Sequence, residues 1–262
     1  MNSKYKEIIK SILIKFDIIK DWFKKITNGM SKLTKTNWII LGIRSFLLLF
    51  YLLTSILGIL DRGKPLCDVV IWLFFMISML HRVSITDNES MGNQKVHKEN
   101  FKPTKSRKIV SENRIALIVA ILWLGVNLIF GLLYTFNALS AELMMLLALM
   151  YSVCDIICIL IYCPFQRWFL KNKCCITCRI YNWDYPMMFT PLIFIPTMYN
   201  YTLVGMSILI LIIWEYAYYK YPERFVEETN ESLSCENCNE FMCKNTLRKL
   251  NVVKCEDKKG GE

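Results

Sequence analysis

Long apolar runs, separated by short polar stretches, dominate the chain from residue 38 onward. A helix needs about 20 mostly apolar residues to cross the roughly 30 Å hydrocarbon layer of a bilayer. Four runs suit that requirement: Trp38–Leu60, Leu66–His81, Ile115–Leu139 and Ala141–Cys163. The second run is the shortest and carries Asp68 near its start, so it fits least well. The pattern predicts four membrane-spanning helices in this part of the chain.

A further apolar region, from Met187 to Tyr219, is too long for one crossing. Its 33 residues would extend roughly 50 Å as a single helix. Pro191 and Pro196 interrupt the region, and each proline removes a helical hydrogen bond. A turn-like stretch, Tyr199–Thr202, follows the second proline, so a break is expected near residues 196–202. The region is therefore expected to form a hairpin of two spans, Met187–Met198 and Leu203–Tyr219. The short first arm could instead be a re-entrant segment.

These spans together predict an all-α integral membrane protein with about six transmembrane helices, the last two forming the proline-broken hairpin. Composition agrees, because 54% of the residues are hydrophobic and the mean hydropathy is +0.33. Such values are too apolar for an ordinary soluble domain.

The amino-terminal residues show a different periodicity, with apolar positions recurring at spacings of three and four. These positions share one helix face: Tyr5, Ile8, Ile12, Phe16, Ile19, Phe23, Ile26 and Met30. Residues 4–30, within segment 1–36, are thus predicted to form a basic amphipathic helix that lies on the bilayer and contacts anionic lipid headgroups. A partner-binding helix or a simple anchor are the alternatives. Nucleic acid is not an expected partner, because no groove-reading motif accompanies the charge.

The net charge of +10 is distributed asymmetrically along the chain. With six spans, 29 of the 32 Lys and Arg residues fall on one side of the membrane, and only Arg62 and Lys64 fall on the other. Positively charged loops stay in the cytoplasm, so both termini are predicted to be cytoplasmic in a multi-pass cell-membrane protein. The segments between the spans are then a basic, flexible linker (82–114), a cysteine-containing loop (164–186) and a cysteine-containing tail (220–262). The spans themselves occupy residues 37–81, 115–163 and 187–219.

Aromatic residues support the hairpin, because Tyr and Trp gather at headgroup level. One group precedes the hairpin and a second closes it: Tyr181, Trp183 and Tyr185, then Trp214, Tyr216, Tyr218, Tyr219 and Tyr221. A hairpin places both groups on the same face of the membrane. The polar residues Arg179, Asn182 and Asp184 near the first group could alternatively line a pocket.

Two cysteine clusters flank the hairpin, and each contains a CxxC. Cys175 and Cys178 form the first motif, and Cys235 and Cys238 form the second. Two CxxC turns on one side of the membrane supply the four thiolates of a tetrahedral metal site, for which zinc is the expected ion. Cys174 and Cys243 are possible additional ligands. An iron–sulfur cluster is the alternative cofactor, in a membrane redox protein, and thiol–disulfide chemistry at one CxxC is another.

Three polar residues lie inside the predicted spans: Arg44, Asn127 and Asp155. Arg44 and Asp155 lie at similar depths, and an intramembrane charge is costly unless it is paired or hydrated. We expect these two side chains to pair, and Asn127 could extend them into a polar track. A structural role is favoured over transport of a small solute or an ion.

No catalytic constellation is recognisable: the chain has no phosphate-binding glycine loop, no HExxH and no convincing Ser/His/Asp arrangement. The sequence therefore predicts a polytopic membrane protein with a metal-binding module whose role is sensing, scaffolding or assembly.

Overall fold

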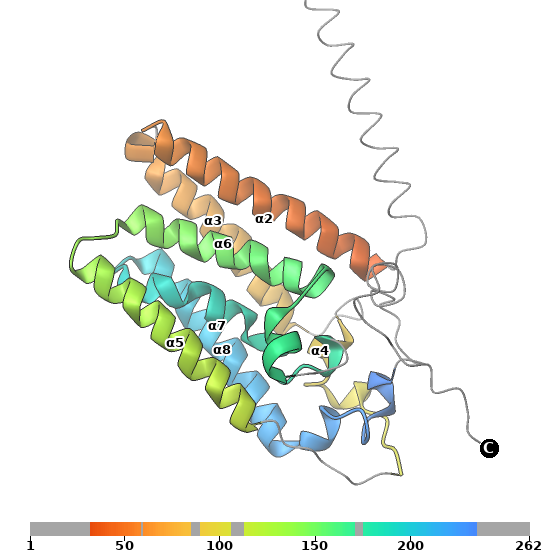
Figure 1. Ribbon diagram of the computed structural model, residues 1–262. Coiled ribbons are helices and arrows are strands. Elements are labelled where there is room, and N and C mark those ends of the chain that lie inside the picture. The colour runs from red at the N-terminus through yellow and green to blue at the C-terminus, as the bar shows by residue number, and fades with distance from the viewer. Residues whose placement is uncertain (1–31, 59, 85–89, 106–112, 171–174, 235–262) are drawn as a thin grey trace, which may run out of the picture.

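The computed structural model describes residues 32–58, 60–84, 90–105, 113–170 and 175–234 (Figure 1). Helices account for the architecture of this part of the chain, which contains no strand beyond an isolated bridge between Pro103 and Asn230. The predicted all-α class is confirmed. The predicted amphipathic helix at residues 4–30 lies outside the described residues.

Among the described residues, five helices are long and apolar enough to cross a membrane, so the protein is a polytopic membrane protein. They are α2 (Lys32–Ile56), α3 (Leu60–Val83, apolar from Leu66), α5 (Asn113–Thr135), α6 (Ala141–Leu160) and α8 (Met198–Lys220). All five lie side by side in one bundle (Figure 1). One end of this bundle, which we call the loop-rich end, is where α2 and α5 begin and where α3, α6 and α8 end.

The first arm of the predicted hairpin is shorter than a span. It consists of the α-helix α7 (Asp184–Phe189) and the 3₁₀-helix η5 (Thr190–Phe194), and both pack against α8. At 1.5 Å per α-helical and 2.0 Å per 3₁₀ residue, the arm is roughly 19 Å long. The re-entrant alternative therefore describes it better than a sixth span does.

The break lies at the start of the expected region. Ile195 and Thr197 are extended, and α8 begins directly after them, so the predicted turn residues Tyr199–Thr202 form its first turns instead. The reason is an N-cap: the Thr197 side chain accepts a hydrogen bond from the backbone N–H of Asn200. A threonine cap satisfies a donor that no helical carbonyl can reach, and so fixes the helix start.

Apolar packing holds the arm inside the bundle. The main core combines residues of α2, α3, α6 and α8 with residues of the arm, among them Tyr51, Phe75, Leu149, Phe189 and Leu203. The arm comes especially close to α5 at Gly131, where a Cβ atom would lie 2.2 Å from the Phe194 ring. Glycine is therefore required at this crossing.

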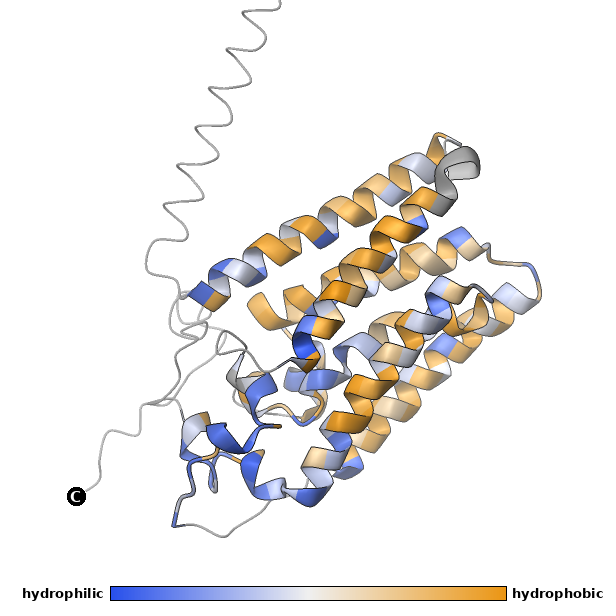
Figure 2. Cartoon of the chain, turned by 180° about the vertical axis from the view of Figure 1, so that it is seen from behind, coloured by the Kyte–Doolittle hydropathy of each residue, from blue (hydrophilic) through white to orange (hydrophobic). Residues whose placement is uncertain are grey.

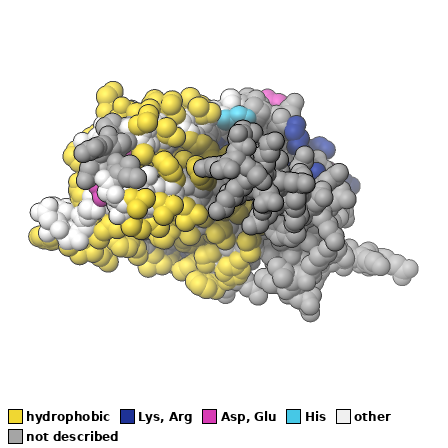
Figure 3. All heavy atoms as spheres, turned by 90° about the horizontal axis from the view of Figure 1, so that it is seen from above, with side chains coloured by type: hydrophobic (Ala, Val, Ile, Leu, Met, Phe, Trp, Pro, Cys, Tyr) yellow, Lys and Arg dark blue, Asp and Glu magenta, His cyan; other side chains and the backbone are white. Residues whose placement is uncertain are grey.

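The outer faces of the helices remain apolar. On α5, for example, Leu117, Ile121 and Leu124 are 60%, 60% and 57% exposed. Figure 2 shows that the helices of the bundle consist mostly of hydrophobic residues, whereas hydrophilic residues gather at the loop-rich end. Figure 3 shows hydrophobic side chains covering the face of the bundle that it presents. A surface this apolar is what lipid covers.

A folded structure, which we call the cap, closes the loop-rich end. It comprises residues 90–105, 175–183 and 221–234. Thr104 donates to the carbonyl of Glu228, and the backbone N–H of Glu231 donates to the carbonyl of Lys102, so two of these segments are joined directly. The predicted flexible linker therefore has a folded part, in which Ser90, Asn93 and Lys95 are buried.

The aromatic groups at the two ends of the hairpin lie together, as the hairpin predicts. The Tyr181 and Trp214 rings are 6.3 Å apart. They do not form a simple belt, however, because Trp214 and Tyr218 are buried against Phe225 inside the cap. Tyr216 and Tyr219 remain exposed.

Candidate functional site

The first CxxC lies in the cap, at the 3₁₀-helix η3 (Cys175–Thr177). The backbone N–H of Cys178 donates to the carbonyl of Cys175 over 3.0 Å, which closes the motif into a tight turn. Cys178 is buried with Ala116, Val119 and Leu170. The remaining predicted ligands, Cys235 and Cys238, and the additional candidates Cys174 and Cys243 lie outside the described residues. Within the described ranges, no group of three or more His, Cys, Asp or Glu residues could hold a metal ion.

The short helix α4 (Met91–Gln94) connects the surroundings of the two clusters. It packs against η3, which carries Cys175, and also against the 3₁₀-helix η7 (Glu231–Leu233). Ser234 follows η7 and is the residue immediately before Cys235. The chain that leads into the second cluster is thus anchored on the same helix as the first cluster.

A buried lysine holds this region together. Lys95 is 2% exposed, and its ammonium donates to the carbonyls of Ile176 at 2.6 Å and Cys178 at 3.3 Å. The same ammonium lies 5.0 Å from the centre of the Trp214 ring and 5.5 Å from that of Phe225. Carbonyl dipoles and aromatic faces together stabilise a cation that has lost its water.

An ion pair closes the outer side of the cap. Arg179 binds both carboxylate oxygens of Glu215 on α8, and the Trp183 indole donates to the same carboxylate at 2.7 Å. The Arg179 guanidinium also lies 3.7 Å from the centre of the Tyr218 ring. Arg179 therefore serves the packing of the cap on α8.

Two further thiols, Cys158 and Cys163, lie where α6 ends, next to Cys175 of the first CxxC. The Cys158 thiol hydrogen-bonds to the sulfur of Cys163. The Cys163 sulfur also accepts the backbone N–H of Gln166 at 3.5 Å. Cys175 points to the same place, because its thiol lies 3.4 Å from Gln166 Oε1 and 3.7 Å from the carbonyl of Cys158.

Cys163 lies beyond the end of α6 and has the environment of a reactive thiol. The hydrogen bond from Cys158, together with the N–H groups of Gln166 and Phe165, lowers the pKa of the Cys163 thiol to about 7 against the opposing effect of burial. Hydrogen bonds to a thiolate stabilise the charged form, which is the nucleophile.

The expected pairing of Arg44 and Asp155 is confirmed as a contact between α2 and α6. Arg44 Nη1 lies 2.9 Å from Asp155 Oδ2 and also donates to the carbonyl of Ser152 at 2.8 Å. The two side chains are 3% and 16% exposed. Asn127 does not extend this pair, because its amide donates to the carbonyl of Trp123 in its own helix.

A second ion pair joins α3 to the start of α7. Arg82 Nη1 lies 3.1 Å from Asp184 Oδ2, and the guanidinium lies 5.0 Å from the centre of the Tyr185 ring. Asp155 also interacts electrostatically with Arg82 and Asp184. Two arginines and two aspartates thus form one cluster between α2, α3, α6 and α7.

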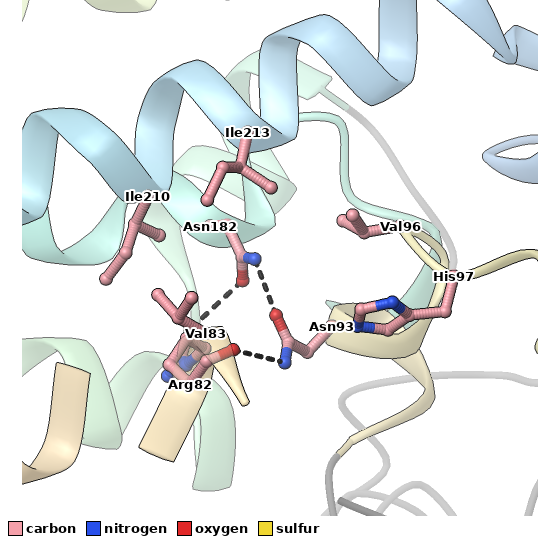
Figure 4. A pocket seen from close by; sticks show the side chains of 8 residues that line it. All are labelled: Arg82, Val83, Asn93, Val96, His97, Asn182, Ile210 and Ile213. Carbon is pink, nitrogen blue, oxygen red and sulfur yellow. Dashed lines mark hydrogen bonds between the residues drawn. The ribbon is translucent and has the colours of Figure 1, made fainter. Parts of the chain in front are cut away.

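A small pocket adjoins this cluster at the loop-rich end (Figure 4). Its lining comes from α3, the cap and α8: Arg82, Val83, Asn93, Val96, His97, Asn182, Ile210 and Ile213. Arg82 donates to Asn182 at 3.0 Å, and the Asn182 amide donates to Asn93 Oδ1 at 2.6 Å. Asn182 therefore lines a pocket, as the sequence suggested. Asp184 contacts the same arginine, Arg82, and these contacts also hold the cap on the bundle.

The roles of several of these residues could not be recognised from the sequence. Lys95 and Asn93 lie in a polar segment without periodicity, and Arg82 follows an apolar run where a charge normally ends a span. The helical spacing of Cys154, Cys158 and Cys163 was visible in the sequence, but such a stripe is also ordinary packing.

Comparisons with protein-family models, with curated proteins and with solved structures found no match for this chain.

Proposed function

We propose that this polytopic membrane protein carries a zinc site that fastens its carboxyl-terminal tail to the cap. The ligands are Cys175 and Cys178 from one cluster and Cys235 and Cys238 from the other. One observation supports this most: α4 packs against both η3 and η7, and η7 ends one residue before Ser234 and two before Cys235. Only a short segment after η7 would then be needed to bring Cys235 and Cys238 to the same ion as Cys175 and Cys178.

The chemistry of the surroundings favours a thiolate site. Four thiolates around one divalent ion leave a net negative charge, and the Lys95 ammonium lies against the carbonyls of the first motif. Cys178 would rotate its thiol out of the apolar cluster on binding. An iron–sulfur cluster uses the same donor type and is the competing occupant. The site would make docking of the tail depend on metal, which suits a sensing or scaffolding role.

Metal analysis of the full-length protein, purified without oxygen in detergent, tests this proposal. The wild type is expected to be colourless and to retain about one zinc ion per chain. Cys175→Ser and Cys238→Ser are each expected to lose that zinc. Cys67→Ser is the matched control, because Cys67 lies in α3 far from the cap, and it should retain the metal. Unchanged zinc in a Cys175→Ser/Cys238→Ser double variant would refute the shared site, and a brown protein with visible absorption would assign iron–sulfur instead.

We also propose that the cap faces the cytoplasm. The support is the excess of Lys and Arg in the segments that leave the loop-rich end, and a reducing compartment suits free thiols. Labelling of Cys238 by a membrane-impermeant thiol reagent, with a zinc chelator present so that the thiol is free, should occur only after the cell is opened. Labelling of intact cells would reverse this orientation.

A further inference from the structure

The pocket at the loop-rich end has a polar wall and an apolar wall (Figure 4). The polar residues are Arg82, Asn93, His97 and Asn182, and none of the described residues that line the pocket is acidic. The other lining residues are aliphatic: Val83, Val96, Ile210 and Ile213. The cavity measures about 30 Å³, far below the roughly 300–1,000 Å³ of a pocket that encloses a drug-sized ligand. It therefore suits one polar group of a larger molecule, the rest of which lies outside.

Among the described residues, His97 is the polar side chain of this pocket that has no hydrogen-bond partner. Figure 4 shows its ring directed toward Asn93. The other polar side chains hold one another in place, because Asn182 accepts from Arg82 at 3.0 Å and donates to Asn93 at 2.6 Å. The planar N–H donors of a guanidinium match the oxygens of a phosphate group. The pocket therefore offers a fixed cation and an unused imidazole N–H to an acceptor.

The charge around the pocket favours an anion. Arg82 is paired with Asp184, but Arg224 has no carboxylate partner among the described residues. Arg224 is 7% exposed, its Nη1 donates to the carbonyl of the pocket residue Val96, and its Nε is buried without a hydrogen bond. A cation that has lost its water interacts with a nearby charge more strongly than a hydrated one does. An anionic group in the pocket would thus lie near a positive charge that no described carboxylate compensates.

The apolar wall continues onto the lipid-facing surface of the bundle. Leu80 lies three residues before Val83 in α3, and Leu209 lies four residues before Ile213 in α8, so each pair shares a helix face. Leu80 is 54% exposed and Leu209 is 45% exposed. Because α3 and α8 pack against each other, aliphatic side chains of both helices extend from the pocket toward the membrane interior. An acyl chain is the apolar molecule that a bilayer supplies there.

We propose that the pocket binds the phosphate group of an anionic phospholipid, and that one acyl chain of this lipid lies along α3 and α8. Arg82 and the His97 N–H contact the phosphate oxygens, and the Arg224 guanidinium stabilises their charge. A zwitterionic headgroup binds less well, because its ammonium group lies near these two arginines. The lipid joins α3, α8 and the cap, and the site uses none of the proposed zinc ligands.

Native mass spectrometry of the full-length protein in detergent, titrated with phosphatidylglycerol or with phosphatidylcholine, tests the proposal. The wild type is expected to bind one phosphatidylglycerol saturably and about tenfold more tightly than phosphatidylcholine, which is the effect of about one charge-assisted hydrogen bond. Excess inorganic phosphate should not displace the lipid, because free phosphate buries no acyl chain. Displacement by inorganic phosphate would overturn the lipid assignment in favour of a soluble anion.

Three variants locate the bound lipid. Ile213→Trp should abolish the saturable binding, because the indole fills the cavity. Ile212→Trp is the matched control, since Ile212 is 57% exposed and does not line the pocket, and it should bind as the wild type does. His97→Ala breaks no hydrogen bond of the described residues, so it should keep the wild-type unfolding temperature while its phosphatidylglycerol affinity falls about tenfold.

Equal affinity of the wild type for the two lipids would overturn the proposal. It would also be overturned if a folded Ile213→Trp bound phosphatidylglycerol as Ile212→Trp does. If Ile213→Trp does not fold, His97→Ala decides, because an unchanged preference for phosphatidylglycerol in that variant places the lipid elsewhere on the bundle.

Discussion

Replacing Arg44 with methionine is expected to destabilise the protein by about 3–5 kcal/mol, because the change leaves the Asp155 carboxylate without its cation at a buried position. The loss has a second part, since Arg44 also donates to the carbonyl of Ser152. Methionine keeps most of the side-chain volume, so the effect reports the charge and not a cavity. The contact joins α2 to α6. The other helix against which α2 packs in the bundle is mainly α3.

Thermal unfolding in detergent micelles measures this effect. Lys35→Met is the matched control, because Lys35 is an exposed lysine on the same helix, and it should unfold close to the wild-type temperature. The double variant Arg44→Met/Asp155→Leu should recover much of the loss, since replacing both partners of a buried ion pair by apolar groups is often neutral. If the double variant is no more stable than Arg44→Met, the pair does not act as a unit.

Lys95→Met is expected to destabilise the cap by about 3 kcal/mol, which is the usual scale for losing charge-assisted hydrogen bonds and leaving their acceptors buried. The change also removes a cation from the faces of Trp214 and Phe225. Because this ammonium joins η3 to α4, the variant should loosen the whole cap while leaving the membrane helices intact.

Amide hydrogen exchange separates these two parts of the molecule. Exchange in residues 175–183 and 225–234 should accelerate in Lys95→Met, whereas exchange in α5 and α6 should not change. Lys98→Met is the control, because Lys98 is exposed in the same segment and should exchange as the wild type does. Equal exchange in the two variants would show that Lys95 does not hold the cap together.

The apolar runs were sufficient to predict the bundle, because lipid imposes a length and a composition that few other structures share. The pairing of Arg44 with Asp155 followed from the same physics: a charge inside a span needs a partner at its own depth. Helix ends were less predictable. The start of α8 depends on the Thr197 cap, which outweighs the turn-like composition of Tyr199–Thr202.

The cap was not predictable from local sequence, because its contacts join residues far apart in the chain. Lys95 binds carbonyls of Ile176 and Cys178, and Lys102 binds Asn230 through its backbone N–H. A polar segment such as residues 90–105 has no periodicity of its own, and its order depends on those distant partners. The proximity of Cys158 and Cys163 was not predictable from the sequence either, because it depends on the residue at which α6 ends.

X-ray absorption at the zinc edge, on the full-length protein purified without oxygen, tests the central claim most directly. A metal site made of Cys175, Cys178, Cys235 and Cys238 predicts four sulfur neighbours at about 2.3 Å from zinc, with no nearer nitrogen or oxygen shell. Zinc bound through nitrogen or oxygen, or a purified protein without bound metal, would contradict a thiolate site that joins the tail to the cap.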